Sequence, residues 1–284
     1  MFNRKDLVVK AIQAAGIVRK NLKIDAVSTI DPVEIAEKLG CTVFFQDIDA
    51  LEGMYSKEPR PVIVIGSHRP NGRKIFTCAH ELGHHYFNHG TKVDQLANTY
   101  EQSKNAEEFL VDCFAGFLLM PKRAVLNAIS KRNFDISNIT AIELYILASA
   151  FGTGYGTMLN HLTYSLNMIS KAKFNELKKY SPKDIKRNIG IETSSDIVMV
   201  DSNWLGRPID LQIGDIIACP KNYEVEDSLL KIYENAASDI YSFYEATNAG
   251  YSRIHDNKEW AANIRIARKE YSGLAKYRFL TDED

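Results

Sequence analysis

The feature that most constrains this chain is a polar pattern set in an apolar stretch, His80-Glu81-x-x-His84. Residues four apart lie on one face of a helix, so His80 and His84 can both direct an imidazole nitrogen at one metal ion. Glu81 follows His80 by about 100° of rotation, which puts its carboxylate beside that ion. The preceding run, residues 75–79, is mostly apolar and predicts that the helix enters a core, where polar side chains need partners. The pattern is typical of zinc hydrolases with a glutamate general base, and the alternative is a surface helix with two solvated histidines.

A third metal ligand is needed, and the spacing excludes one class of zinc protein. The metzincin pattern places a third histidine six residues after the second, but this position is Gly90. His89 comes one residue too early, and on an ideal helix it would lie roughly opposite His80. We therefore interpret His85 and His89 as structural or solvated side chains.

A pair of carboxylates further along the chain offers a better third ligand. Glu108 and Asp112 are four residues apart and share a helix face, and the segment beyond them is almost wholly apolar as far as Met120. In a buried helix this spacing predicts that Glu108 binds the metal and that Asp112 accepts the free N–H of a ligand histidine. Glu107 is the competing ligand. It points about 100° away from Glu108, and we expect it to be solvated or to lie at the N-terminus of its helix.

Several other short motifs accompany these two segments. In chain order the set is Asp31-Pro32-Val33-Glu34-Ile35-Ala36, Leu51-Glu52-Gly53-Met54-Tyr55, the segment from Arg73 to His84, Glu108-x-x-x-Asp112-x-Phe114-Ala115 and Leu118-Leu119-Met120-Pro121. In combination they make residues 1–170 resemble the ImmA/IrrE family of metallopeptidases. Val111 is a conservative departure, since that family commonly has alanine there. The resemblance does not extend to the last hundred residues or so.

The resemblance implies a gluzincin-like site in which two histidines, His80 and His84, and one glutamate, Glu108, hold one Zn²⁺ per chain. It also implies a protein substrate, a helix-turn-helix transcriptional repressor whose cleavage releases stress-response or mobile-element genes. Glu81 would remove a proton from water and deliver it to the leaving amine. The sequence identifies no oxyanion donor and no substrate-binding residue.

A rival interpretation is a non-proteolytic, metal-containing regulator that binds a repressor or a toxin–antitoxin partner. Its metal site would be structural. The intact Glu81 argues against this interpretation, because a structural site needs no general base.

Composition and length limit the other possibilities. The 284 residues are 45% hydrophobic and 25% charged, which is typical of a soluble globular protein with one or two domains. No apolar run approaches the roughly 20 residues that span a bilayer, so we expect no membrane association. The four cysteines are isolated, which indicates a reducing compartment and predicts a cytoplasmic protein.

Charge is distributed unevenly along the chain. Residues 1–189 carry 25 basic and 19 acidic side chains, whereas residues 190–284 carry 10 and 17. This asymmetry indicates two modules. Together with the resemblance, it implies a zincin-like metallopeptidase domain at 1–135, a helical, helix-turn-helix-like segment with a basic linker at 136–189, and a C-terminal module at 190–284. The sensory or substrate-docking role that we expect for this module is an analogy with related proteins. Neither half is basic enough to predict direct binding of nucleic acid.

Residue patterns predict an α+β fold whose first domain is mainly helical with a small mixed sheet. The expected elements are helices at 3–21, 32–39, 123–129, 142–151 and 157–168 and strands at 41–45, 53–56 and 62–65. The strands at 53–56 and 62–65 form a hairpin, which is either an edge that pairs with substrate backbone or an ordinary structural hairpin. Residues 90–104 predict a mobile loop. The helices at 142–151 and 157–168 look like a helix-turn-helix, which we interpret as a packing element rather than a docking site.

The last hundred residues predict a small α+β module. Two strands are expected, at 197–200 and 214–219, followed by two helices. The first helix would run over 227–246 with an apolar stripe from Leu230 to Tyr244. The second would begin at a capping box, Asp256-Asn257-Lys258-Glu259, and carry Trp260 and Ile264.

Overall fold

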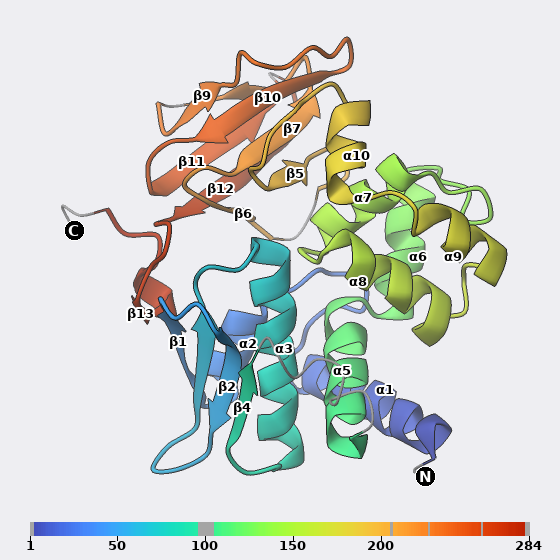
Figure 1. Ribbon diagram of the computed structural model, residues 1–284, viewed down its shortest axis with the longest axis vertical. Helices are drawn as coiled ribbons and strands as arrows, with labels where there is room; N and C mark the ends of the chain where they lie inside the picture. Colours follow the sequence, from blue (N-terminus) through green and yellow to red (C-terminus); the bar gives the residue numbers. More distant parts are fainter. Residues whose placement is uncertain (1–2, 96–104, 205–206, 227, 257, 282–284) are drawn as a thin grey trace. The chain divides into compact units, whose positions relative to one another are not determined.

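The computed structural model describes residues 3–95, 105–204, 207–226, 228–256 and 258–281 (Figure 1). The chain divides into two compact units. The first unit holds residues 1–127 and 270–277, and the second holds residues 128–269 and 278–284. A short segment near the C-terminus therefore belongs to the same unit as the N-terminal part of the chain. Among the helices described, none is both long and apolar enough to cross a membrane.

The α-helices described wholly within the first unit are α1 (Arg4–Asn21), α2 (Pro32–Lys38), α3 (Asn71–Phe87) and α5 (Ala106–Leu119). Three of them, α1, α2 and α5, begin after a residue whose side chain caps them, whereas α3 follows Pro70 without a side-chain cap. Before α1 the Asn3 side chain accepts a hydrogen bond from the backbone N–H of Lys5, and before α2 the Asp31 side chain accepts one from that of Val33. These bonds satisfy N–H groups that have no partner inside the helix.

The first unit also contains a five-stranded mixed sheet. Its strands are β1 (Thr42–Gln46), β2 (Leu51–Ser56), β3 (Val62–Gly66), β4 (Lys92–Gln95) and β13 (Gly273–Leu274), in the order β13-β1-β3-β2-β4. The pair β1–β3 is parallel, and the other pairs are antiparallel. The small mixed sheet expected from the sequence is present. A short 3₁₀ turn, η3 (Ala275–Tyr277), follows β13.

The expected hairpin is present, but one of its two interpretations and part of the expected mobile loop are corrected. The β2–β3 hairpin is not an edge of the sheet, because β4 pairs with the open side of β2. Part of the segment expected as a mobile loop, Lys92–Gln95, is therefore a strand whose backbone groups find partners in β2. The rest of that expected loop, residues 96–104, lies outside the described residues.

Helix α3 lies between the sheet and α5 (Figure 1). It contacts β2 and β3 on one side and α5 on the other, and α5 in turn packs along α1. The buried Arg19 of α1 donates a hydrogen bond from Nη1 to the carbonyl oxygen of Leu118 in α5, at 2.9 Å. This packing fixes α3 and α5 side by side, so residues on their facing sides meet in the interior.

The second unit starts with helices. Helix α6 (Lys122–Lys131) crosses the boundary between the units and is followed by α7 (Ala141–Ala150), α8 (Tyr155–Asn160), a π-helical turn η2 (His161–Ser165), α9 (Lys171–Leu177) and α10 (Pro182–Asn188). Thr140 and Glu143 form a capping box at the start of α7. The helix expected at 157–168 ends earlier, since the α-helical part stops at Asn160 and the chain continues as the π-helical turn. A docking or packing role for this helix pair stays a prediction.

Two four-stranded sheets complete the second unit. One has the order β5-β7-β10-β9, with bounds Ile197–Met199, Ile216–Pro220, Tyr241–Ala246 and Leu230–Ile232. The other has the order β6-β12-β11-β8, with bounds Ile209–Gln212, Ala261–Ala267, Gly250–His255 and Glu224–Val225. Strand β7 is buried on both faces. Ile217 and Cys219 join the core that includes residues of both sheets, whereas Ile216 and Ala218 join a second cluster with α7.

The expected C-terminal α+β module is wrong, because both helices predicted there are replaced by strands. Among the described residues of 190–281, no α-helix is present. Neighbouring residues of β10 face opposite cores, since Phe243 joins one cluster and Tyr244 packs against the other. This alternation of period two belongs to a strand. The helical spacing from Leu230 to Tyr244 arose by chance, because it spans β9, a loop and β10, and it includes Ile240, which is 68% exposed.

The segment expected to cap the second helix is a strand-connecting turn. The Asp256 carboxylate accepts hydrogen bonds from the backbone N–H groups of Lys258, at 2.9 Å, and Trp260, at 3.1 Å. An aspartate that bonds to backbone two residues ahead stabilises a turn as readily as it caps a helix, so the sequence pattern alone does not distinguish them. After this turn Ile264 and Ile266 of β12 are fully buried and alternate with Arg265, as in a strand.

Candidate metal centre

Helix α3 carries the polar pattern into the interior of the first unit. His80, Glu81 and His84 are all buried there. The close approach of α5 depends on Gly83, since a Cβ at this position would lie 2.8 Å from Cβ of Val111 and 3.2 Å from Cδ1 of Phe114. Glycine therefore allows the two helices to approach closely enough for side chains of α5 to reach those of α3.

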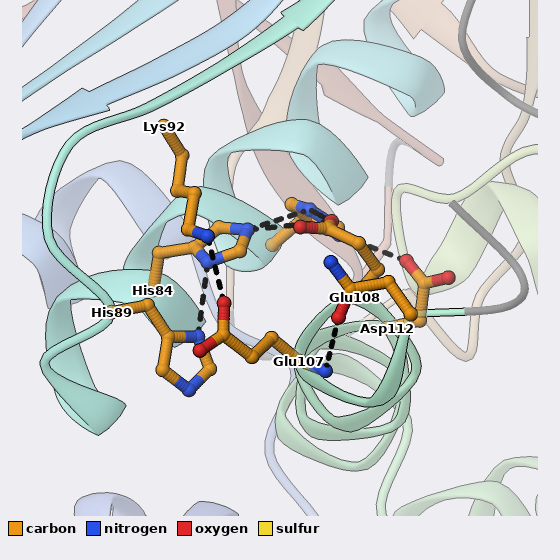
Figure 2. Close-up of polar contacts among 8 residues, drawn as sticks. His84, His89, Lys92, Glu107, Glu108 and Asp112 are labelled. Carbon is orange, nitrogen blue, oxygen red and sulfur yellow. Dashed lines mark hydrogen bonds and ion pairs between the residues drawn. The ribbon is translucent and has the colours of Figure 1, made fainter. Parts of the chain in front are cut away.

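Helix α5 brings Glu108 to the two histidines. The Asn105 side chain caps this helix by accepting a hydrogen bond from the N–H of Glu107, at 2.9 Å, which places Glu108 in the first turn. The buried carboxylate of Glu108 lies beside the imidazole of His84 (Figure 2). The Oε2 atom of Glu108 is 3.2 Å from Nε2 of His80 and 3.5 Å from Nε2 of His84.

The mutual distances of these three atoms fit a single zinc ion. The two Nε2 atoms of His80 and His84 are 3.2 Å apart, so the three separations are 3.2, 3.2 and 3.5 Å. Zinc bonds of about 2.0–2.2 Å at tetrahedral angles place ligand atoms about 3.3–3.5 Å from one another. Two imidazoles and a carboxylate are also a donor set that zinc prefers. The residues present therefore fit the ion that the sequence implies.

The charge of Glu108 suits a cation. Burial by itself raises the pKa of the Glu108 carboxyl, but hydrogen bonds from His80 and His84 and the charge of these rings lower that pKa well below its usual range. A metal ion in the same position would act in the same direction. Glu108 is therefore ionised at neutral pH.

Asp112 lies one turn beyond Glu108 and reaches His80 from the other side of the ring. Its Oδ1 atom is 2.8 Å from Nδ1 of His80. A carboxylate here accepts a hydrogen bond from Nδ1–H, and the Nε2 lone pair of His80 then points toward Glu108 and His84. The structure thus places Asp112 where the sequence expects the partner of a ligand histidine.

His89 occupies a position that the sequence reasoning missed. The helical-wheel argument that put it opposite His80 does not apply, because α3 ends at Phe87 and the chain reverses at Asn88. The Nδ1 atom of His89 lies 3.1 Å from Nδ1 of His84 (Figure 2). Burial lowers the pKa of His89, while the charge of Glu107 raises it by a smaller amount. The only available signal was Asn88, a residue type that tolerates the left-handed conformation that ends helices.

Glu107 and His85 lie outside the cluster. Glu107 lies in the first turn of α5, as expected, and its Oε2 atom forms an ion pair with Nζ of Lys92 at 2.7 Å (Figure 2). Lys92 belongs to β4, so this pair joins the edge strand to α5. The Nδ1 atom of His85 lies 3.0 Å from the hydroxyl of Tyr55 in β2, and burial lowers the pKa of His85.

Glu81 lies on the side of α3 that faces β2. Its side chain is fully buried. A Cβ built on Gly53 of β2 would collide with the Oε1 atom of Glu81 and would lie 2.5 Å from the Cγ2 atom of Thr77. The absence of a side chain at Gly53 leaves the space that the Glu81 carboxylate occupies.

Two histidines, a glutamate from a second helix and a glutamate next to the first histidine form the arrangement that is typical of zinc-dependent hydrolases. Residues 36–163 match the family model of Peptidase_M78, the IrrE N-terminal-like domain. This part of the chain is therefore a domain of that metallopeptidase family, and its His80, His84 and Glu108 lie near one another as the ligands of a zinc site do. A comparison of the chain with curated proteins found no match.

Proposed function

We propose that this protein is a zinc-dependent endopeptidase whose metal is held by His80, His84 and Glu108, with Glu81 as general base. The observation that carries the proposal is the set of three ligand-atom separations, 3.2, 3.2 and 3.5 Å, among buried side chains from two helices. The match to the Peptidase_M78 family supports the same reaction class.

The metal ion and the side chains around it have separate roles in the proposed reaction. His80, His84 and Glu108 would hold the zinc, which when bound would supply a lowered pKa of water and a polarised peptide carbonyl. The Glu81 carboxylate removes the proton from the attacking water and delivers it to the leaving amine. The burial of Glu81 against Gly53 of β2 supports a carboxylate held in one position.

The proposed substrate is a helix-turn-helix transcriptional repressor, cleaved at one site within a stress-response or mobile-element switch. This step is supported by the resemblance of residues 1–170 to the ImmA/IrrE metallopeptidases. We further propose a cytoplasmic location and keep the division into a peptidase domain at 1–135, a helical segment at 136–189 and a C-terminal module at 190–284. The proposed role of that module is sensing or substrate docking.

Metal content tests the centre directly. Wild type, Glu108→Gln and Glu107→Gln would be purified side by side, and zinc would be measured by elemental analysis. Glu107 is the matched control, because it is the neighbouring carboxylate in the same helical turn but pairs with Lys92 instead. About one zinc per chain is expected in wild type and in Glu107→Gln, with loss in Glu108→Gln. Equal zinc in all three would remove Glu108 from the ligand set.

The base assignment needs a separate comparison. Glu81→Gln removes the proton acceptor but none of the three ligands. We therefore expect this variant to hold the full zinc content but not to cleave purified helix-turn-helix repressors. Mass spectrometry of the reaction products would detect any cleavage. Cleavage by this variant at the wild-type rate would exclude Glu81 as the base. A wild-type protein that holds zinc and binds a repressor but leaves it intact would favour the rival, a non-proteolytic regulator.

A further inference from the structure

The end of helix α3 has a hydrogen-bond pattern that controls where His89 lies. The helix stops at Phe87, and Asn88 adopts the left-handed conformation with φ 60° and ψ 45°. The N–H of Asn88 then donates to the carbonyl of His85 at 3.1 Å, and the N–H of His89 donates to the carbonyl of His84 at 3.1 Å. These two bonds are the Schellman motif, in which the second residue past the helix folds back on the last turn. The backbone of His89 is thereby held against that of His84.

The same reversal brings the two imidazoles together. Their ring centroids are 5.3 Å apart with an angle of 66° between the ring planes, and their Nδ1 atoms are 3.1 Å apart. The other side of the His89 ring stacks on Phe87, at 5.8 Å between centroids and an angle of 21°. The backbone bond and the aromatic contact together hold the ring orientation.

Two Nδ1 atoms at hydrogen-bond distance need one donor and one acceptor. His84 presents Nε2 to His80 and Glu108, so a metal ion at that position takes the Nε2 lone pair. The proton of neutral His84 must then be on Nδ1, which makes His84 the donor. The Nδ1 atom of His89 is consequently the acceptor, and the proton of His89 is on Nε2.

We infer that His89 is a positioning residue for the metal centre, which fixes the tautomer and ring orientation of His84 by accepting its Nδ1–H. The inference rests on the proposed zinc site and does not depend on peptidase activity. The two ligand histidines then have different partners, a carboxylate on Asp112 for His80 and a neutral imidazole on His89 for His84. Such partners orient metal ligands and contribute to metal affinity.

A matched pair of variants tests the acceptor. His89→Asn and His89→Leu have nearly the same shape, but only asparagine presents an acceptor oxygen near the position of Nδ1. Zinc affinity would be measured by competition with a chelator, and the melting temperature of each metal-free protein would report folding. We expect His89→Leu to bind zinc about 10–100-fold more weakly than wild type, with His89→Asn within a few-fold of wild type. The metal-free proteins should melt at similar temperatures.

A measurement on the unaltered protein complements the variants. Nitrogen-15 NMR of the zinc-loaded wild type should show the proton of His84 on Nδ1 and that of His89 on Nε2. Wild-type affinity in His89→Leu, equally weak binding in both variants, or the opposite tautomer of His89 would overturn the inference while leaving the zinc site in place. Absence of zinc binding by wild type would overturn the metal centre itself and this role with it.

Discussion

The α-carbon of Gly53 in β2 lies directly against the carboxylate of Glu81 in α3. A Cβ at Gly53 would collide with Oε1 of Glu81 and lie 3.1 Å from its Cδ atom. The strand and the helix are joined through a loop and a further strand, so this contact depends on how the sheet packs under α3. It means that a single methyl group at position 53 changes the position of the proposed base without touching a proposed metal ligand.

We expect Gly53→Ala to reduce cleavage by about 100-fold, because a displacement of about 1 Å at a reacting group has an effect of that size. Zinc content should remain that of wild type. Gly16→Ala is the control, since a Cβ at Gly16 in α1 meets no atom within 4 Å. Steady-state cleavage rates and zinc analysis of the two variants check this. Undiminished cleavage by Gly53→Ala would show that Glu81 has room to move without loss of function.

The contact between Gly83 and Val111 predicts a coupled pair of substitutions. Gly83→Ala forces its Cβ to within 2.8 Å of that of Val111, so we expect the free energy of unfolding to fall by about 1–3 kcal/mol and zinc affinity to fall as α5 moves. Val111→Ala removes the opposing methyl groups and should restore part of both losses in the double variant. Denaturant titration followed by circular dichroism gives the coupling energy. If the losses of the two single variants simply add in the double variant, α5 moves away from the new methyl group at position 83 whatever residue occupies position 111.

Asp112 offers a test of metal support without a large effect on folding. Its side chain is 54% exposed and accepts from His80 at 2.8 Å. We expect Asp112→Ala to weaken zinc binding by about 10–100-fold, while the free energy of unfolding of the metal-free protein changes by less than about 1 kcal/mol. Chelator competition and urea titration measure the two quantities. A large loss of metal-free stability would instead make Asp112 a structural residue.

Asp210 anchors the second unit. Its carboxylate accepts two bonds from Arg265, at 2.6 and 2.9 Å, and lies 3.5 Å from Arg207. Removing Asp210 takes this carboxylate away from the largely buried charge of Arg265. Asp210→Ala should therefore lower the free energy of unfolding of this unit by about 3–5 kcal/mol. Glu226→Ala, which breaks an exposed pair with Arg253, is the control and should cost less than about 1 kcal/mol.

Tryptophan fluorescence is the measurement for that prediction. The chain contains two tryptophans, both in the second unit: Trp204 is buried in its core, and Trp260 is partly buried and packs against that core. The fluorescence transition of Asp210→Ala should therefore move to lower urea, with zinc affinity in the first unit unchanged. A transition at the wild-type midpoint would mean that Arg265 finds equivalent partners.

The sequence was informative wherever local periodicity decides the outcome. The spacing of positions 80, 81 and 84 places them on one helix, and that of positions 108 and 112 places them on one face of another. Helical spacing alone therefore predicted the side chains that could bind a metal. The caps at Asn3 and Asp31 were readable for the same reason. In the C-terminal part the same reasoning failed, because residues from β9, a loop and β10 happened to repeat at helical spacing.

What the sequence by itself determined is therefore the set of chemical groups and the helices that carry them, since a helix relates residues three or four positions apart. Only the tertiary structure decided that Glu108 meets His80 and His84, that Gly53 lies against Glu81 and that β4 covers the edge of β2. These contacts join residues far apart in sequence, and they depend on packing that no local pattern specifies. His89 is the intermediate case, because it lies only five positions after His84 but a left-handed turn at Asn88 decides whether the two rings meet.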